Sequence, residues 1–164
     1  MGIDAANERE ALLQKLADFP DQLTSLVAGL TLTQLTTVYS LGEWTVAQNV
    51  HHIFDSHARG YLNCKLILTE EEPPLKRYQQ DAWAQLADGS AADISHSLFL
   101  IRALHMRWVV LWQSLTDEQF ARGGRLPNAT QLTTIADLLA VYVAHGPGHY
   151  EQIVQALAAG GVHR

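Results

Sequence analysis

The chain has 164 residues, of which 48% are hydrophobic and 17% charged, and its formal net charge at pH 7 is −6. This length and composition predict a single globular domain, residues 1–164, that can bury a core without disulfides. The negative charge argues against a nucleic-acid partner, because proteins that bind nucleic acid carry clustered basic side chains. The one cysteine, Cys64, excludes an internal disulfide and a cysteine-based zinc site.

The first ten residues carry neither the basic nor the apolar region of a signal peptide. No apolar run reaches the length of about 20 residues that a membrane-spanning helix needs. We therefore expect a cytoplasmic protein with no membrane partner.

Residues 5–29 form the first predicted helix, since apolar side chains recur there at three- and four-residue steps. Pro20 interrupts the pattern and predicts a kink or break, because proline lacks a backbone N–H and its ring clashes with an earlier carbonyl. Gly29 predicts the end of the helix. The threonine-rich residues 31–40 predict a connector with a short helical turn.

A second helix is predicted from Thr45 to Thr69. Thr45 and Gln48, three residues apart, form a capping box in which each side chain accepts a backbone N–H of the other residue. The segment that follows, residues 70–89, shows little helical pattern. A loop of that length in a compact domain is often functional; the alternative is a packed connector held by its aromatic side chains.

Three histidines lie on the second predicted helix. Periodicity does not decide whether His51 or His52 points inward, although we expect His51 to be solvated. His52 by itself fits a satisfied core histidine. His57 falls on the apolar stripe, and we interpret it as a packing residue rather than a group that supports a ligand.

A third helix is predicted over residues 91–115, with His96 and His105 beside its apolar stripe. We interpret both histidines as structural or exposed. The last helix is predicted over residues 134–159, because Thr134 and Asp137 form another capping box and two glycines follow Ala159.

His145 and His149 lie four residues apart on the last helix, so their rings share one face. Such a pair can hold one metal ion, or consist of one half-buried and one solvated histidine. The apolar residues 138–144 predict surroundings in which an unsatisfied imidazole would be costly. Pro147, between the two histidines, predicts a bend or a restart of the helix that would change their geometry.

Four long amphipathic helices without a strand pattern predict an all-α fold, an up-and-down or crossed four-helix bundle. Metal sites in such bundles are built from facing helices, here the second and the last. Three neutral imidazoles on a divalent ion would leave one coordination position open, which is typical of catalytic sites.

From about Trp44 onward the chain resembles the DinB-like superfamily, and within it the YfiT-like branch. The residues that carry the resemblance are 44–52, Asp55-Ser56-His57, 68–70, Tyr78, Ala82-Trp83, His145-Gly146-x-x-His149 and Gln152-Ile153. The resemblance implies a four-helix bundle with a divalent metal ion on three histidines, which correspond to His52, His145 and His149. Many members of the branch are dimers.

Relatives in that branch are described as metal-dependent hydrolases, or as transferases that attach a low-molecular-weight thiol such as bacillithiol to an electrophile. By this resemblance we favour thiol transfer to a small-molecule substrate, with zinc or nickel as the metal, since imidazole suits both. Cys64 lies on an apolar stripe, so the sulfur must come from a cosubstrate. Relatives commonly have a further histidine where this chain has Gly148, so a non-catalytic dimerisation or binding module is the remaining alternative.

Other residues receive expected roles around this site. Asp55 and Glu151 either orient the ligand rings or are surface charges. Tyr78 and Trp83, in the segment 70–89, would cover the substrate. We also expect a homodimer through helix faces, to which three aromatic residues would contribute: Trp108, Trp112 and Tyr142.

Overall fold

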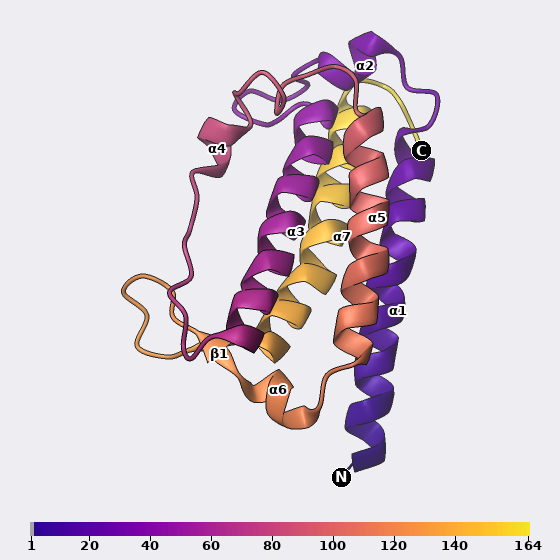
Figure 1. The fold of residues 1–164 in the computed structure, drawn as a ribbon. Helices are drawn as coiled ribbons and strands as arrows, with labels where there is room; N and C mark the ends of the chain where they lie inside the picture. The colour runs from indigo at the N-terminus through magenta and orange to yellow at the C-terminus, as the bar shows by residue number, and fades with distance from the viewer. Residues whose placement is uncertain (1) are drawn as a thin grey trace.

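A computed structural model describes the backbone of residues 2–164 and the side chains from residue 7 onward. Four long helices lie alongside one another (Figure 1): α1 (Gly2–Val27), α3 (Val46–Thr69), α5 (Ser95–Gln113) and α7 (Ile135–Ala159). The helices α1 and α3 each contact both α5 and α7. The predicted four-helix bundle is therefore confirmed.

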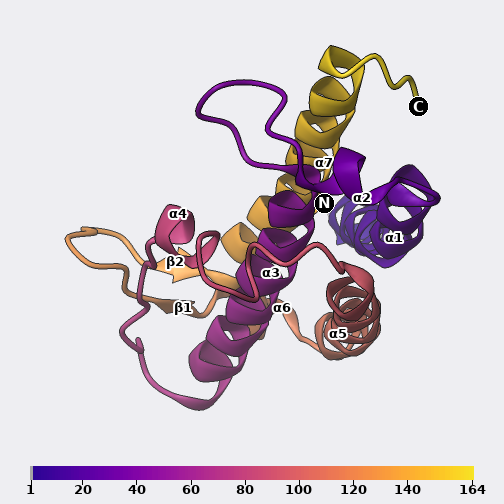
Figure 2. The ribbon, with the colours of Figure 1, turned by 90° about the horizontal axis from the view of Figure 1, so that it is seen from above.

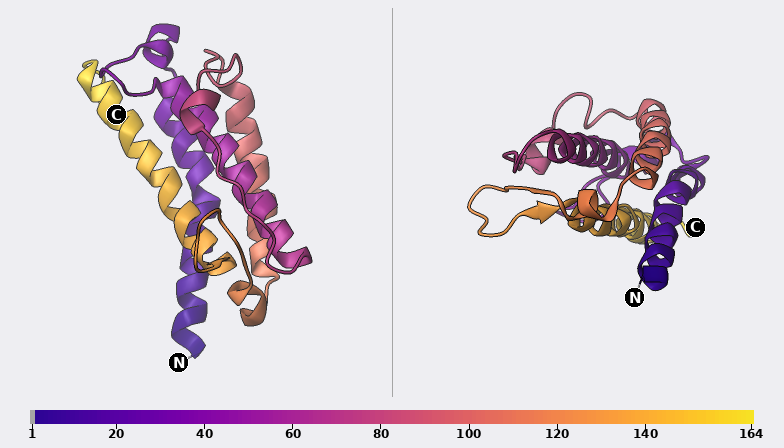
Figure 3. Two further views of the ribbon diagram at one scale, coloured as in Figure 1. Left: turned by 90° about the vertical axis from the view of Figure 1, so that its left-hand side faces the viewer. Right: turned by 60° about the horizontal axis from the view of Figure 1, so that its bottom comes forward.

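The bundle is of the crossed type, because neighbouring helices do not simply alternate in direction. Figure 1 shows α1 and α7 running upward, whereas α3 and α5 both run downward. The connection between α3 and α5, residues 70–94, therefore returns along the whole bundle. It passes over the α3–α7 side (Figures 1 and 3) and includes the short helix α4 (Gln80–Trp83).

The two predicted capping boxes begin their helices as expected. The Thr45 N–H donates to Oε1 of Gln48 over 3.0 Å, and the Gln48 N–H donates to Oγ1 of Thr45 over 3.1 Å. Thr134 and Asp137 repeat the exchange over 2.9 and 3.0 Å. Gly29 follows α1 with a φ of 70°, a left-handed conformation that glycine adopts without strain.

Both helices with an internal proline continue through it, so neither a break at Pro20 nor a restart at Pro147 occurs, whereas the kink and the bend stay predictions. Pro20 deprives the Leu16 carbonyl of its helical donor, but Nδ1 of His105 donates to that carbonyl over 2.7 Å. Pro147 lies on an exposed side of α7, where its ring does not disturb the packing.

Two hydrophobic clusters fill the bundle, one toward each end. One contains Trp108 and Trp112, and the other contains Phe19 and Ile153. Both tryptophans are fully buried in their own bundle. They therefore cannot contribute to a dimer interface as the sequence suggested, and the homodimer itself stays a prediction.

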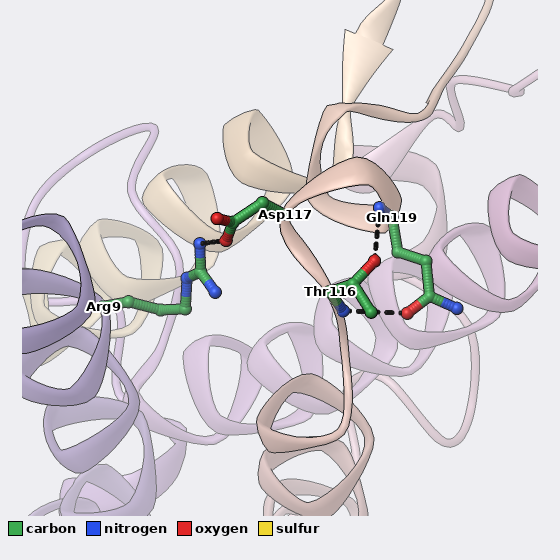
Figure 4. Close-up of polar contacts among 4 residues, drawn as sticks. All are labelled: Arg9, Thr116, Asp117 and Gln119. Atoms are coloured by element: carbon green, nitrogen blue, oxygen red, sulfur yellow. Dashed lines mark hydrogen bonds and ion pairs between the residues drawn. The ribbon is translucent and has the colours of Figure 1, made fainter. Parts of the chain in front are cut away.

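Short elements close the bundle: α2 (Leu32–Thr36), α6 (Asp117–Ala121), β1 (Gly123–Gly124) and β2 (Thr133–Thr134). The two strands pair antiparallel (Figure 2), and Figure 1 shows β1 near α6 at the lower end of the bundle, away from α4. Figure 4 shows Thr116 and Gln119 exchanging the capping hydrogen bonds of α6, while Arg9 reaches from α1 to Asp117 at 2.7 Å. Within the described part of the chain, no helix is both long and apolar enough to cross a bilayer.

Candidate metal centre

The structure brings His52, His145 and His149 together where α3 and α7 pack against each other. One ligand atom from each ring lies within 4.8 Å of the others. His52 is buried, and the two rings on α7 are half-buried. The Nε2 atoms of His52 and His145 lie 3.3 Å apart. Residues 93 positions apart in the sequence thus form one cluster.

A separate side chain holds the Nδ1 atom of each ring. The hydroxyl of Tyr78 lies 3.2 Å from Nδ1 of His52. Nε2 of His57 lies 3.1 Å from Nδ1 of His145. These contacts leave Nε2 of each ring directed at the centre of the cluster.

Asn49 holds the third ring, with its Oδ1 atom 2.9 Å from Nδ1 of His149. The Asn49 amide donates through Nδ2 to the Thr45 carbonyl over 3.0 Å, which fixes the amide with its oxygen toward the ring. An amide oxygen only accepts, so His149 carries its proton on Nδ1. Its Nε2 therefore presents a lone pair.

The surroundings favour neutral imidazoles. Burial, and then the nearby rings of His149 and His145, lower the pKa of His52 to about 3. Burial and His149 lower the pKa of His145 to about 4, and burial also lowers the pKa of His149. Neutral imidazole is the form that binds a metal, so protons do not compete for these nitrogens at neutral pH.

This donor set fits a divalent ion of the zinc type. Two nitrogens that each lie about 2.0–2.1 Å from a tetrahedral zinc ion are about 3.3–3.4 Å apart. The Nε2 atoms of His52 and His145 are separated by 3.3 Å. Three neutral nitrogens also match the protein part of a catalytic zinc site, which keeps one position open.

A small pocket opens beside His149, one of the three rings. The ring of Trp44 lies 4.6 Å from that of His52 and stacks on that of His149 with an interplanar angle of 6°. The pocket encloses about 160 Å³ and includes His149, Trp44, Asp81 and Gln152 in its lining. A small molecule could therefore reach the cluster from this side.

The segment 70–89, which was expected to cover the site, contacts the ligand rings through Tyr78. Tyr78 contacts His52 through its hydroxyl, and its ring lies 4.6 Å from that of Trp83. Trp83 itself is 39% exposed. Gln48 ties the segment down by donating to the Ala84 carbonyl over 2.9 Å.

Asp55 and Glu151, for which ring orientation and surface charge were the two alternatives, do not contact the three rings. Asp55 lines a different cavity of about 250 Å³ with His51 and Asp88, and burial followed by Asp88 raises the pKa of Asp55. Glu151 is exposed on α7. Among the described side chains, neither is hydrogen bonded to one of the three rings, which are held by neutral groups instead.

Three other histidines can be compared with the roles that the sequence predicted for them. His51 is buried rather than solvated, because it bonds Oγ of Ser97 over 2.7 Å and the Ala91 carbonyl over 2.9 Å. His57 is fully buried and contacts a ligand ring, so it does more than fill the stripe. His105 is buried and structural, as one of its two interpretations had it.

Cys64 is a core residue. Its thiol is fully buried among the aromatic side chains of one cluster, and burial raises its pKa to about 11. A thiol with that pKa is protonated at neutral pH and is a poor nucleophile.

The sequence profile of the DinB superfamily matches residues 15–153. The chain belongs to the DinB superfamily. Within the superfamily it is 40% identical over 148 residues to YfiT of Bacillus subtilis, which is named as a candidate metal-dependent hydrolase. That alignment covers 90% of this chain and 83% of YfiT. A relative from Geobacillus thermodenitrificans, named in the same way, is 38% identical over 91% of this chain and 84% of its own length.

The fold agrees with a solved structure from the same superfamily. The structure of Bacillus subtilis YfiT, described as an unusual four-helix bundle, superposes with a TM-score of 0.90 at 39% sequence identity. The match covers 95% of this chain and 89% of the other. The family resemblance identified from the sequence is therefore confirmed, together with its four-helix fold.

Proposed function

We propose that this DinB-superfamily protein is a metal-dependent enzyme that transfers a low-molecular-weight thiol to an electrophilic small molecule. The observation that carries the proposal is the convergence of three neutral imidazoles, His52, His145 and His149, on one point beside an open pocket. A divalent ion bound there would lower the pKa of a thiol or a water molecule in its open position.

The protein's own residues set the geometry of that site. Tyr78, Asn49 and His57 each hold the Nδ1 atom of one ligand ring, so that Nε2 points inward. Groups that fix ligand rings in this way commonly sustain both metal affinity and activity. Trp44 lies against the rings of His52 and His149 beside the pocket, so that only small molecules would reach the site.

Two features of the protein suit thiol transfer. Cys64, the only protein thiol, is buried and has a raised pKa, so the attacking sulfur would be supplied by a cosubstrate. The carboxylates nearest the open side, Glu43 and Asp81, are exposed at the pocket rather than against the ligand rings. A thiol held as thiolate needs no such base during attack, because its proton leaves on binding.

Hydrolysis is the second candidate, and the names of the relatives favour it. The Bacillus subtilis and Geobacillus relatives are both named as candidate metal-dependent hydrolases. Three-histidine sites can also activate water without an adjacent carboxylate. In this case the pocket beside Trp44 would bind an ester or amide.

The test is a comparison of both reactions in the metal-loaded protein. A panel of small thiols is mixed with monochlorobimane or chlorodinitrobenzene, and conjugation is followed for the wild type and the His52→Ala variant. His96→Ala is the matched control, since His96 is an exposed histidine on α5 away from the cluster. Conjugation that depends on metal and on His52, but not on His96, would support transfer. Metal-dependent ester or amide cleavage without conjugation would establish the second candidate instead.

A further inference from the structure

A chain of three imidazoles crosses the bundle behind the ligand cluster. It begins at the Leu16 carbonyl on α1, which lies 2.7 Å from Nδ1 of His105 on α5. Nε2 of His105 lies 2.8 Å from Nδ1 of His57 on α3. Nε2 of His57 lies 3.1 Å from Nδ1 of His145 on α7. Each of the four long helices thus contributes one member.

The hydrogen-bonded chain of imidazoles is anchored by the proline inside α1. In a regular helix the N–H of residue 20 would donate to the Leu16 carbonyl, but Pro20 has no N–H. A buried carbonyl without a donor is costly, and His105 supplies the missing one. Because a carbonyl only accepts, the proton of a neutral His105 must be on Nδ1.

The direction of every later hydrogen bond follows from that first one. Both rings are buried inside the bundle, where a charged imidazole would be costly, so each ring has a single proton. Nε2 of His105 can then only accept, and His57 must donate to it from Nδ1. Nε2 of His57 is left as an acceptor for the Nδ1–H of His145.

We propose that His105 and His57 are positioning residues that fix His145 as the tautomer protonated on Nδ1, so that its Nε2 presents a lone pair to the ligand cluster. With the proton on Nε2, His145 would turn an N–H toward the cluster, and two acceptor nitrogens would face each other across 3.1 Å. A buried pair of that kind is unfavourable.

Packing around the chain holds the two positioning rings in place. The rings of His57 and His105 stack with centroids 4.9 Å apart and an interplanar angle of 9°. Phe19 lies against both rings, and Tyr142 meets His57 edge-on with a centroid distance of 5.1 Å. The metal affinity expected below rests on the proposed function, whereas the tautomer is a property of the metal-free protein.

The first experiment reads the tautomers directly. Long-range ¹H–¹⁵N correlation spectra of the metal-free wild type distinguish a protonated ring nitrogen from an unprotonated one. The proposal predicts the proton on Nδ1 in His105, His57 and His145. A proton on Nε2 of His145 would overturn it, whatever the protein's metal affinity.

The second experiment replaces His105, the imidazole of the hydrogen-bonded series that lies furthest from the ligand cluster. The His105→Phe variant leaves the donor Nδ1–H of His57 without an acceptor, so His57 and His145 should become mixtures of tautomers. Zinc affinity, measured by competition with a chelator, should fall about ten- to hundredfold, as for the loss of other groups that orient a ligand. Unchanged tautomers and affinity in this variant would contradict the proposal.

The matched control is His51→Phe. His51 is an equally buried imidazole on α3, but it bonds Ser97 and the Ala91 carbonyl and lies outside the chain. It should retain both the tautomer of His145 and the zinc affinity. An equal loss of affinity in both variants would point to packing alone and overturn the positioning role.

A conservative variant provides a rescue. In His57→Gln, the side-chain oxygen can accept from Nδ1–H of His145, so affinity should stay closer to the wild type than in His57→Phe. Equal losses in the two would count against the proposal. If His105→Phe fails to fold, the tautomers of the wild type and the comparison of His57→Gln with His57→Phe still test the proposal. A wild type that shows the predicted tautomers yet binds no zinc would refute the proposed function while supporting the fixed tautomer.

Discussion

Gly146 on α7 lies directly against the ring of Phe19 on α1, so that a Cβ atom at Gly146 would be 2.7 Å from the ring. Because Gly146 follows His145, this contact sets the approach of α1 to the ligand-bearing turn of α7. Gly148, two residues further, faces open space: a Cβ there would meet nothing within 4 Å. Two neighbouring glycines of one helix therefore have different roles.

We expect Gly146→Ala to destabilise the protein by about 1–3 kcal/mol, because the added methyl group overpacks a closed contact. Gly148→Ala is the control and should stabilise it by up to about 1 kcal/mol, through the helix propensity of alanine. Urea unfolding of both variants measures the difference. Equal effects in the two variants would contradict the close approach of α1 and α7.

From the sequence, Pro147, which lies between these two glycines, predicts a bend or a restart of the helix. The structure shows α7 continuing through all three. Pro147 is exposed, and the clash that proline makes is confined to the preceding turn of its own helix. Whether a glycine has room depends on a helix more than 100 residues away in the sequence, which periodicity cannot reveal.

The Tyr78→Phe variant should lower zinc affinity about tenfold, because it removes the hydroxyl that lies 3.2 Å from Nδ1 of His52. The ring would keep its contact with Trp83, so the fold of the segment should not change. Chelator competition gives the affinity, and circular dichroism checks the fold.

Tyr150→Phe is the matched control for this measurement. Tyr150 is a half-buried tyrosine on α7 next to His149, and its hydroxyl has no hydrogen-bond partner among the described residues. It should bind zinc as the wild type does. A Tyr78→Phe variant with wild-type affinity would show that the hydroxyl does not orient His52.

As the pH is lowered, the metal-free protein should begin to lose stability at a higher pH than carboxylate protonation alone predicts. The pKa values of His52 and His145 are lowered to about 3 and about 4, whereas those in the unfolded chain are near 6.5. Between these values the unfolded state binds more protons than the native state. The free energy of unfolding should therefore be constant above about pH 7 and fall as the pH drops below about 6.5, by about 1.4 kcal/mol per pH unit for each proton taken up.

Urea unfolding at pH 8, 7, 6 and 5 tests this dependence. The His105→Phe variant removes one of the depressed groups, because burial also lowers the pKa of His105 to about 4, and its profile should be less steep. A free energy of unfolding that stays flat from pH 8 to pH 5 would contradict the neutral, buried imidazoles.

The homodimer remains to be measured, and the structure changes which residues could form it. Trp108 and Trp112 are fully buried, whereas Phe99, Met106 and Val110 are exposed on α5 at 70%, 68% and 66%. If the expected dimer forms through this face, light scattering should give twice the chain mass at micromolar concentration. Val110→Glu should then give a monomer. Val141→Glu, at an exposed position of α7, is the control. A monomeric wild type would contradict the expectation.

Local signals in the sequence predicted the elements well, because they depend on neighbours in the chain. The capping boxes at Thr45 and Thr134 begin α3 and α7 where expected, and the histidine pair on α7 lies on one face. The groups that hold the ligand rings were missed. His57 looked like stripe filler because its partner, His105, lies on another helix.

For the carboxylates, the sequence left ring orientation and surface charge as alternatives. Asp55 and Glu151 were candidates because they lie near the ligands in the sequence and carboxylates often orient metal-bound histidines. On their helices they face away from the three rings, and neutral groups take the position instead. Asn49, directly after the capping box of α3, carries no sequence signal for this task.

The central claim is that His52, His145 and His149 hold one divalent ion. Elemental analysis of protein purified without added metal tests it most directly, with His145→Ala and the exposed-histidine control His96→Ala beside the wild type. We expect about one zinc or nickel ion per chain in the wild type and in His96→Ala, and its loss in His145→Ala. A wild type that is metal-free and takes up neither added zinc nor added nickel would contradict it.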